Sequence, residues 1–103
     1  MTQVKLVKLK LVEGKKKVWL DWCEELKARK KEVIETLKAE KVLSESCFIS
    51  DDGEYIYYFM EAENFDHKND KHFPIDDDHK EKRTVSLEKV AQLKELFHFE
   101  NRS

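Results

Sequence analysis

The stretch HFPIDDDHK, residues 72–80, brings together the side chains of this sequence that are best suited to chemistry. His72, Asp76 and His79 stand at positions i, i+4 and i+7, so one face of a continuous helix would align them. Histidine with carboxylate is a ligand set for zinc, manganese or iron, and it also suits acid–base catalysis. The stretch therefore leaves three alternatives: a metal site, an acid–base or substrate-binding site, or the start of a helix without chemistry.

Pro74 favours the start of a helix. Proline is disfavoured inside a helix but common at its first position, so His72 should lie before the helix. Asp76 and the two aspartates after it then fall in or near the first turn, where the helix dipole stabilises carboxylates without a ligand. Asp76 could instead cap a helix that begins slightly later. We predict no metal or cofactor here, and keep Asp76 and His79 as catalytic candidates and His72 as a ligand-binding candidate.

A strand and a long helix are the first elements that must position these side chains. Residues 4–12 (VKLVKLKLV) alternate in a way that predicts a strand with one apolar face at Val7, Leu9 and Leu11. Apolar residues recur at three- and four-residue steps across residues 15–41, and no Gly or Pro interrupts them. This pattern predicts one long helix that crosses the sheet.

A hairpin is expected next. LSESCFIS (43–50) and EYIYYFME (54–61) predict two strands, and Asp52-Gly53 supplies the positive φ that a tight turn needs. Both faces of the second strand are apolar, which predicts that both are covered. One face would carry Ile56, Tyr58 and Met60, and the other Tyr55, Tyr57 and Phe59.

The rest of the chain, residues 62–101, is less regular. PIDDDHKEKR predicts a short helix, and SLEKVAQL predicts a second one with Ser86 as its possible N-cap. KELFHFEN (94–101) predicts the last strand. Its two faces would carry Phe97 and Phe99 toward the helices, and His98 and Glu100 toward the opposite side.

This order of elements, βαββαβ, is the ferredoxin-like arrangement. It predicts an α+β fold with a four-stranded antiparallel sheet and helices on one face. A chain of 103 residues has the length of a single domain, covering residues 1–103. Because the open face of the third strand is apolar, we expect a second copy to cover it, which predicts a homodimer.

The residues also carry a resemblance to a known family. It rests on EGK before the long helix, on WLDWCEEL and YIYYFMEAENF, on the H-x-x-I-D-x-x-H spelled by His72, Ile75, Asp76 and His79, and on ELFHFEN. The chain resembles a small, uncharacterised prokaryotic family placed in the dimeric α/β-barrel superfamily. The resemblance implies the ferredoxin-like fold and a barrel-like dimer. That superfamily includes cofactor-free monooxygenases, haem-degrading enzymes and isomerases, so it implies no single reaction.

The open face of the predicted sheet is a second candidate site. Its ionisable and hydroxyl groups could bind or polarise a small carbonyl compound or phenol. His98 and His79 would be the best acid–base candidates if the fold brings them together. The alternative is a polar dimer interface whose hydrogen bonds are satisfied. The expected binding residues on this face are Lys8, Tyr55, Tyr57, Glu100 and His98.

Composition narrows the function classes. Charged residues reach 41% but the net charge is −2, which favours a surface of mixed sign over a nucleic-acid footprint. No apolar run is long enough for a membrane span or a signal peptide, so we expect a cytoplasmic protein. The two cysteines form no CxxC pair. We predict a homodimeric protein that binds a small molecule or acts as a cofactor-free enzyme. The alternative is a non-catalytic assembly or regulatory module.

Overall fold

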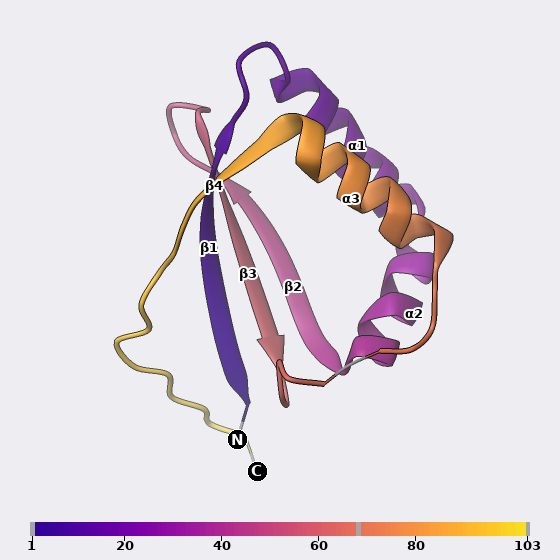
Figure 1. Cartoon of the computed structure of the whole chain (residues 1–103). Helices are drawn as coiled ribbons and strands as arrows, with labels where there is room; N and C mark the ends of the chain where they lie inside the picture. Colours follow the sequence, from indigo (N-terminus) through magenta and orange to yellow (C-terminus); the bar gives the residue numbers. More distant parts are fainter. Residues whose placement is uncertain (1, 68, 103) are drawn as a thin grey trace.

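A computed structural model describes residues 2–67 and 69–102 of the chain. The described residues form four strands and three helices (Figure 1). In order they are β1 (Gln3–Leu11), α1 (Lys16–Ala28), α2 (Lys30–Glu40), β2 (Val42–Ile49), β3 (Tyr55–Ala62), α3 (Pro74–Ser86) and β4 (Leu87–Gln92).

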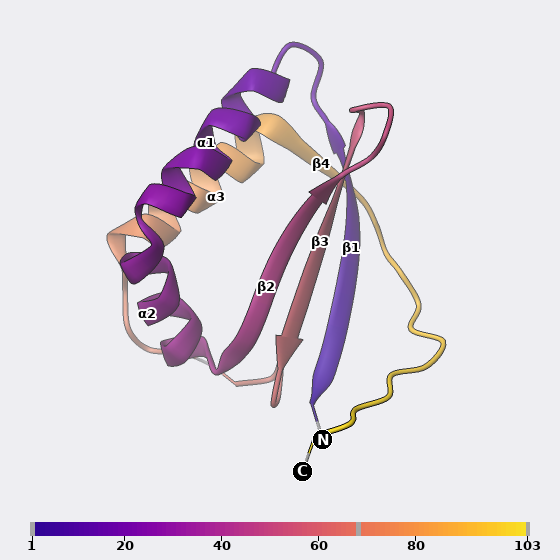
Figure 2. The same cartoon turned by 180° about the vertical axis from the view of Figure 1, so that it is seen from behind.

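The four strands form one antiparallel sheet in the order β2-β3-β1-β4. All three helices cover the same face of this sheet, as the two opposite views in Figures 1 and 2 show. The predicted α+β, ferredoxin-like arrangement is therefore confirmed. No helix among the described residues has the length and apolar character that crossing a membrane would require.

The core lies between the helices and the sheet. The predicted apolar face of β1 points into it, where Leu9 and Leu11 are buried against Trp19 and Trp22 of α1. Ile56 of β3 is 1% exposed in the same cluster. Burying two indole rings and several aliphatic side chains is the main source of stability available to a domain of this size. The side chains that alternate with them along β1 and β3 form the open face of the sheet.

The predicted single helix over residues 15–41 is wrong, because the chain bends at Arg29. This residue leaves helical geometry, with φ −102° and ψ 30°, and separates α1 from α2. Its guanidinium forms ion pairs with Glu32 at 2.6 Å and with Asp78 of α3 at 3.0 Å. The bend therefore coincides with a contact that joins all three helices, and no glycine or proline is needed to produce it.

Helix α3 begins at Pro74, the first helical position, as predicted. The second helix predicted with Ser86 as its N-cap is wrong, because α3 continues to Ser86 and β4 follows at once. Leu87 is buried opposite Leu11 of β1. The apolar residues of SLEKVAQL fit the spacing of a helix and also that of a strand. The segment forms a strand because it can pair with the otherwise unpaired edge of β1.

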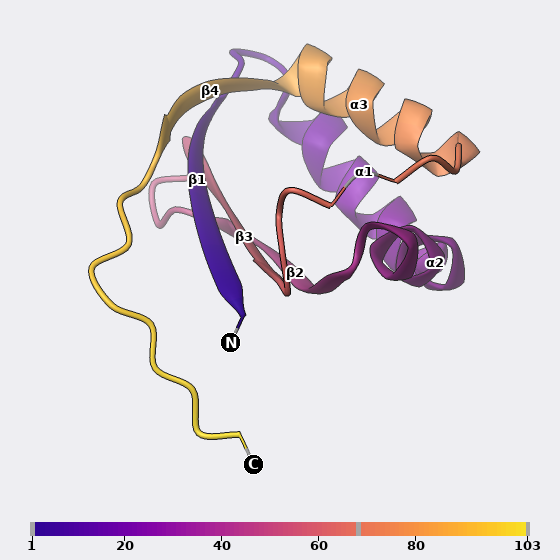
Figure 3. The same cartoon turned by 60° about the horizontal axis from the view of Figure 1, so that its bottom comes forward.

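The strand predicted at residues 94–101 is also wrong. Leu93 donates a backbone hydrogen bond to the carbonyl of Leu6 at 2.8 Å, and the following residues form no regular element. Figure 3 shows this tail on the side of the sheet away from the helices. Phe97 and Phe99, predicted to face the helices, stack on each other and are 72% and 85% exposed. They cannot reach the core because β4 already occupies the sheet edge.

Candidate functional site

A cavity of about 900 Å³ lies between the helical layer and the sheet. Its size is within the range of about 300–1,000 Å³ that is usual for small-molecule sites. Side chains from all four strands and all three helices line it, so the whole fold shapes it. Its apolar wall includes Val7, Leu9, Leu26, Val33, Met60 and Ile75.

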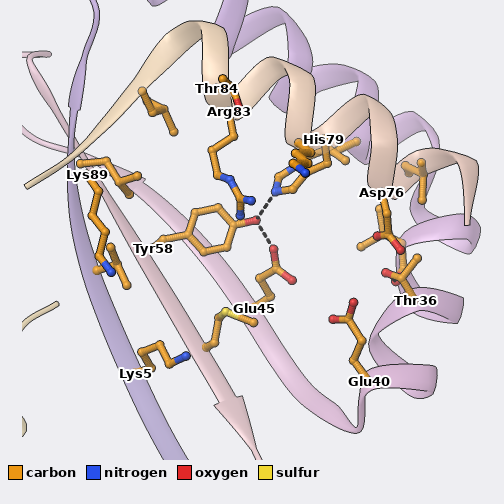
Figure 4. A pocket seen from close by; sticks show the side chains of 18 of the residues that line it. Lys5, Thr36, Glu40, Glu45, Tyr58, Asp76, His79, Arg83, Thr84 and Lys89 are labelled. Atoms are coloured by element: carbon orange, nitrogen blue, oxygen red, sulfur yellow. Dashed lines mark hydrogen bonds between the residues drawn. The ribbon is translucent and has the colours of Figure 1, made fainter. Parts of the chain in front are cut away.

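Tyr58 of β3 lies in the cavity wall and takes part in a chain of hydrogen bonds (Figure 4). The indole Nε1–H of Trp22 donates to Nδ1 of His79 at 2.9 Å. Nδ1 is therefore unprotonated, and a neutral imidazole then carries its proton on Nε2. Nε2 lies 3.4 Å from the hydroxyl oxygen of Tyr58 and donates to it. The Tyr58 hydroxyl in turn donates to Glu45 of β2.

Burial sets the protonation states along this chain. Desolvation, assisted by the charge of Arg83, lowers the pKa of His79 to about 4. The imidazole is therefore neutral at pH 7, in agreement with its hydrogen bonds. Desolvation and the neighbouring Glu45 carboxylate raise the pKa of Tyr58, so the phenol keeps its proton. Desolvation also raises the pKa of Glu45, against the opposing effect of its hydrogen bond from Tyr58.

These states define what the three side chains can do. A carboxylate whose pKa is raised toward neutrality is a better proton acceptor than an exposed one. A phenol that stays protonated can donate a hydrogen bond to a ligand oxygen on which negative charge develops. Glu45 is therefore a candidate proton acceptor, and the neighbouring Tyr58 is a hydrogen-bond donor. The hydrogen bond from His79 fixes the orientation of the phenol.

Other charged side chains surround this centre. Lys5 of β1, Lys89 of β4 and Arg83 of α3 lie on one side of Tyr58 in Figure 4, whereas Glu40 of α2 and Asp76 of α3 lie on the other. Desolvation raises the pKa of both Glu40 and Asp76. A second hollow of about 380 Å³ adjoins the first and shares Lys5, Glu40, Met60 and Asp76 with it.

The His-Asp motif is divided by the structure. Asp76 and His79 line the cavity, as a site would require. His72 precedes the helix, as predicted from Pro74, and its exposed imidazole lies 2.9 Å from Asp77. Asp76 lies in the first turn of α3 and is not the capping residue, because the N-cap position is occupied by Phe73. The three residues therefore do not form one ligand set.

His98 and Glu100 lie in a different cluster, which we call the tail clamp. It also includes Thr2, Glu61 and Arg102, and it fastens the tail to the ends of β1 and β3. Nε2 of His98 lies 3.1 Å from Glu100, and Arg102 lies 2.8 Å from Glu61. The Thr2 hydroxyl lies within hydrogen-bonding distance of Glu61, His98 and Glu100. Glu61 alternates with Tyr58 along β3, so the clamp is on the opposite face of the sheet from His79.

The tail clamp contains a set of donors that could hold a metal ion. Within residues 2–67 and 69–102, the ligand atoms of Glu61, His98 and Glu100 all lie within 4.8 Å of one another. Two carboxylates and one imidazole suit zinc, manganese or iron. The same carboxylates already receive hydrogen bonds and charge from Thr2, His98 and Arg102. The protein therefore compensates their charge by itself.

The remaining predicted residues lie on the open face. Nζ of Lys8 lies 4.3 Å from the ring centre of Tyr55, and Lys8 is paired with Tyr57 across the β1–β3 ladder. Tyr55 and Glu61 are six positions apart on β3, which is roughly 20 Å along a strand. Lys8 and the two tyrosines are therefore far from the tail clamp, and the open-face residues do not form one site.

Sequence reasoning missed Glu45, Tyr58 and Arg83 as functional candidates. Tyr58 was expected on the same strand face as Ile56 and Met60, and that face is the one toward the helices. The pairing of the two hairpin strands could have identified Tyr58 and Glu45 from the sequence. A tyrosine with a glutamate close to it on the neighbouring strand, both facing an apolar layer, indicates a buried polar pair.

Comparisons with curated proteins and with solved structures find no match to this chain. One family model matches residues 2–102, a range that includes the cavity, the hydrogen-bond chain from Trp22 to Glu45 and nearly all of the tail. The chain therefore belongs to the family of unknown function DUF6176.

Proposed function

We propose that the cavity binds a small polar organic molecule and that Glu45 and Tyr58 can move a proton on it without a cofactor. The single observation that carries this proposal is the directed hydrogen-bond chain Trp22–His79–Tyr58–Glu45 on the cavity wall. A partly buried phenol, a partly buried carboxylate and a neutral histidine are costly to keep in a core that apolar side chains could fill. Their retention beside a cavity is typical of functional sites.

The geometry favours proton transfer next to a carbonyl or hydroxyl group of the ligand. Glu45 would accept a proton from the ligand, and its carboxylate would become a neutral carboxylic acid. Tyr58 would then turn its hydroxyl from Glu45 to the ligand oxygen and stabilise the charge that develops there. The Nε2–H of His79 would keep its hydrogen bond to the phenol oxygen throughout. Returning the proton to the same or a neighbouring atom would complete an isomerisation or an exchange.

A fragment screen with matched tyrosine variants tests this proposal. Small alcohols, ketones, carboxylic acids and amines would be screened by ligand-observed NMR against the wild-type protein. Tyr58→Phe removes the hydroxyl in the cavity, whereas Tyr57→Phe removes the neighbouring hydroxyl on the opposite face of β3. We expect bound fragments to lose at least roughly fivefold in affinity with Tyr58→Phe and to be unaffected by Tyr57→Phe.

Two results would contradict the proposal. One is the absence of any fragment that perturbs residues of the cavity. The other is binding that responds equally to the two tyrosine variants. Either would favour the alternative of a non-catalytic assembly module, in which the hydrogen-bond chain only orders the core.

We propose in addition that a second copy of this chain covers the open face, forming the dimeric α/β barrel that gives the superfamily its name. Leu6, Phe48 and Phe59 lie on that face, and Phe48 is 58% exposed. The tail on the same side exposes Phe97 and Phe99, and beyond Leu93 its described residues form no backbone hydrogen bond to a strand. An extended, alternating segment with free backbone groups is suited to pair with the same segment of a second copy.

Light scattering coupled to size exclusion tests the assembly. We expect the mass of a dimer at micromolar concentration and the mass of a monomer for the double variant Phe97→Asp with Phe99→Asp. Leu20→Glu, which changes an exposed apolar residue on the helical side, is the control and should leave the dimer intact. A wild-type protein that is monomeric at this concentration would refute the dimer.

A further inference from the structure

The charged side chains that line the cavity form no ion pair with any other described residue. Within residues 2–67 and 69–102, ion pairs form at several places on the surface and in the tail clamp, but none of them includes a charged residue of the cavity. These seven residues are Lys5, Glu40, Glu45, Asp76, Lys80, Arg83 and Lys89. Lys80, Arg83 and Lys89 are exposed, whereas the carboxylates of Glu40, Glu45 and Asp76 are partly removed from water. Partly desolvated carboxylates that form no ion pair indicate that a cationic partner is missing.

The two signs are separated in space. Figure 4 shows Lys5 and Lys89 projecting from the sheet and Arg83 reaching toward Tyr58, whereas Glu40 and Asp76 face the cavity from the helices on the other side. The cavity is therefore polarised, with Arg83 and Lys89 at a cationic end and Glu40 and Asp76 at an acidic end. Lys5 belongs to neither end alone, because it lines both hollows and its Nζ lies 4.5 Å from the ring centre of Phe65. Tyr58 and Glu45 lie between the two ends.

The acidic end is under electrostatic strain. Desolvation raises the pKa of Glu40, and the charges of Asp76 and Glu45 raise it further. Desolvation raises the pKa of Asp76 and the charge of Asp77 raises it further, against the opposing effect of His72. These carboxylates therefore repel one another without a cation between them. An ammonium group would relieve the repulsion and receive hydrogen bonds from both.

The cationic end of the cavity is suited to bind an anionic group of a ligand. Arg83 presents a planar guanidinium, which matches a carboxylate in a two-point contact. Its charge is also one of the causes that keep His79 neutral, so an anion placed against Arg83 would weaken that effect. Lys89 supplies further positive charge from β4.

We propose that the ligand of this cavity is a small zwitterion, with a carboxylate bound at Arg83 and Lys89 and an ammonium group bound at Glu40 and Asp76. This inference rests on the proposed function, because it names the ligand class of the same cavity. The apolar wall of Leu26, Val33 and Met60 would contact the carbon atoms that join the two charged groups. A carbon–hydrogen or hydroxyl group in the middle of such a ligand would lie within the region of Tyr58 and Glu45.

A series of linear ω-amino carboxylates tests this inference. Compounds with four, six and eight carbon atoms would be titrated by calorimetry against the full chain, beside the alkylamine and the alkanoate of each length. We expect one length to bind at least roughly tenfold more tightly than both of its singly charged counterparts, because two ion pairs form in place of one.

Two double variants test which end of the cavity binds which charged group of the ligand. In Glu40→Gln with Asp76→Asn, the affinity for the zwitterion should fall to the affinity for the alkanoate. In Arg83→Gln with Lys89→Gln, it should fall to the affinity for the alkylamine. The control double variant Lys94→Gln with Glu95→Gln, in the exposed tail, should change nothing. Circular dichroism checks that each variant folds. A folded variant of either kind that keeps the wild-type preference would overturn the assignment.

The outcomes separate this inference from the proposed function. If neutral fragments bind in the cavity but no zwitterion binds better than its singly charged counterparts, the ligand class is refuted and the binding function stands. If neither fragments nor zwitterions perturb the cavity, both are refuted.

Discussion

His79 and His98 are both hydrogen-bonded to groups that include a hydroxyl and a glutamate, yet the two clusters differ in their charge balance. In the cavity, His79 is neutral and Tyr58 donates to Glu45, whose carboxylate forms no ion pair among the described residues and is only partly compensated by the charge of Arg83. In the tail clamp, His98 contacts Glu100, and Arg102 reaches both clamp carboxylates. The same residue types are thus arranged once with their charges compensated and once without.

This difference separates a structural role from a binding role. In the tail clamp, hydrogen bonds from Thr2 and His98 lower the pKa of Glu100 to about 2, so folding favours its ionised form. In the cavity, desolvation raises the pKa of Glu45, so folding disfavours its ionised form. A carboxylate that stabilises the fold needs nothing further, whereas one that is tolerated at a cost is suited to a ligand.

The largest expected effect comes from removing each histidine. His79→Ala would leave the indole N–H of Trp22 and the hydroxyl of Tyr58 without this partner and would open space in the core, which should cost about 3 kcal/mol of unfolding free energy. His98→Ala removes contacts from a cluster nearer to solvent and should cost less than about 1 kcal/mol. Urea denaturation of both variants measures the difference. Equal losses would remove the distinction between the two clusters.

The pH dependence of stability is the second way to separate them. The pKa of His79 is about 4 in the folded protein and about 6.5 in the unfolded chain, so only the unfolded chain gains this proton between these values. Stability should therefore fall as the pH is lowered from 6.5 to 4, by roughly 2 kcal/mol because the imidazole keeps some solvent contact. The contribution of Glu100 should disappear only at lower pH, as its carboxylate is protonated toward pH 2.

Denaturation curves between pH 7 and pH 3.5 test this order, with His79→Gln as the reference. The wild type should lose stability relative to the variant across the upper part of this range. Parallel curves for the two proteins would show that His79 does not remain neutral in the fold.

The sequence predicted the layers of the fold but not its last third. Alternation in β1 predicts its buried face correctly, because Leu9 and Leu11 pack against the two buried tryptophans. The hairpin is predicted instead by its turn residues Asp52-Gly53 between two strand-like segments. The segment SLEKVAQL (86–93), predicted as a helix, and the segment 94–101, predicted as a strand, can both form a strand, and only pairing with the free edge of β1 decides between them. Local periodicity contains no information about which of two candidates reaches an edge first.

The candidate site shows the same limit. Pro74 placed the start of α3 correctly, and this start brings Asp76 and His79 to the cavity while it leaves His72 outside. Tyr58 and Glu45 belong to different strands and meet only because of the hairpin register. Their importance depends on burial and on the absence of ion pairs around them, which are properties of the packed molecule.

A third way to sharpen the comparison is to neutralise carboxylates in each cluster at pH 7. Glu40 has a raised pKa, so its ionised form lowers stability above the pKa of the unfolded chain. Glu40→Gln should therefore raise the unfolding free energy, by up to about 1 kcal/mol. Glu100 has a lowered pKa, so Glu100→Gln should lower the melting temperature. Thermal melts that move in the same direction for both variants would contradict the comparison.

The smallest effect is expected for His72, the histidine that belongs to neither cluster. Its imidazole and the Asp77 carboxylate are 71% and 67% exposed, so solvent screens their contact almost completely. His72→Ala should change the unfolding free energy by less than about 0.3 kcal/mol and should leave fragment binding unchanged. A loss of binding would place His72 at the mouth of the cavity when a ligand is present. The motif H-x-x-I-D-x-x-H would then act as a unit after all, joined by a ligand that contacts both ends of it.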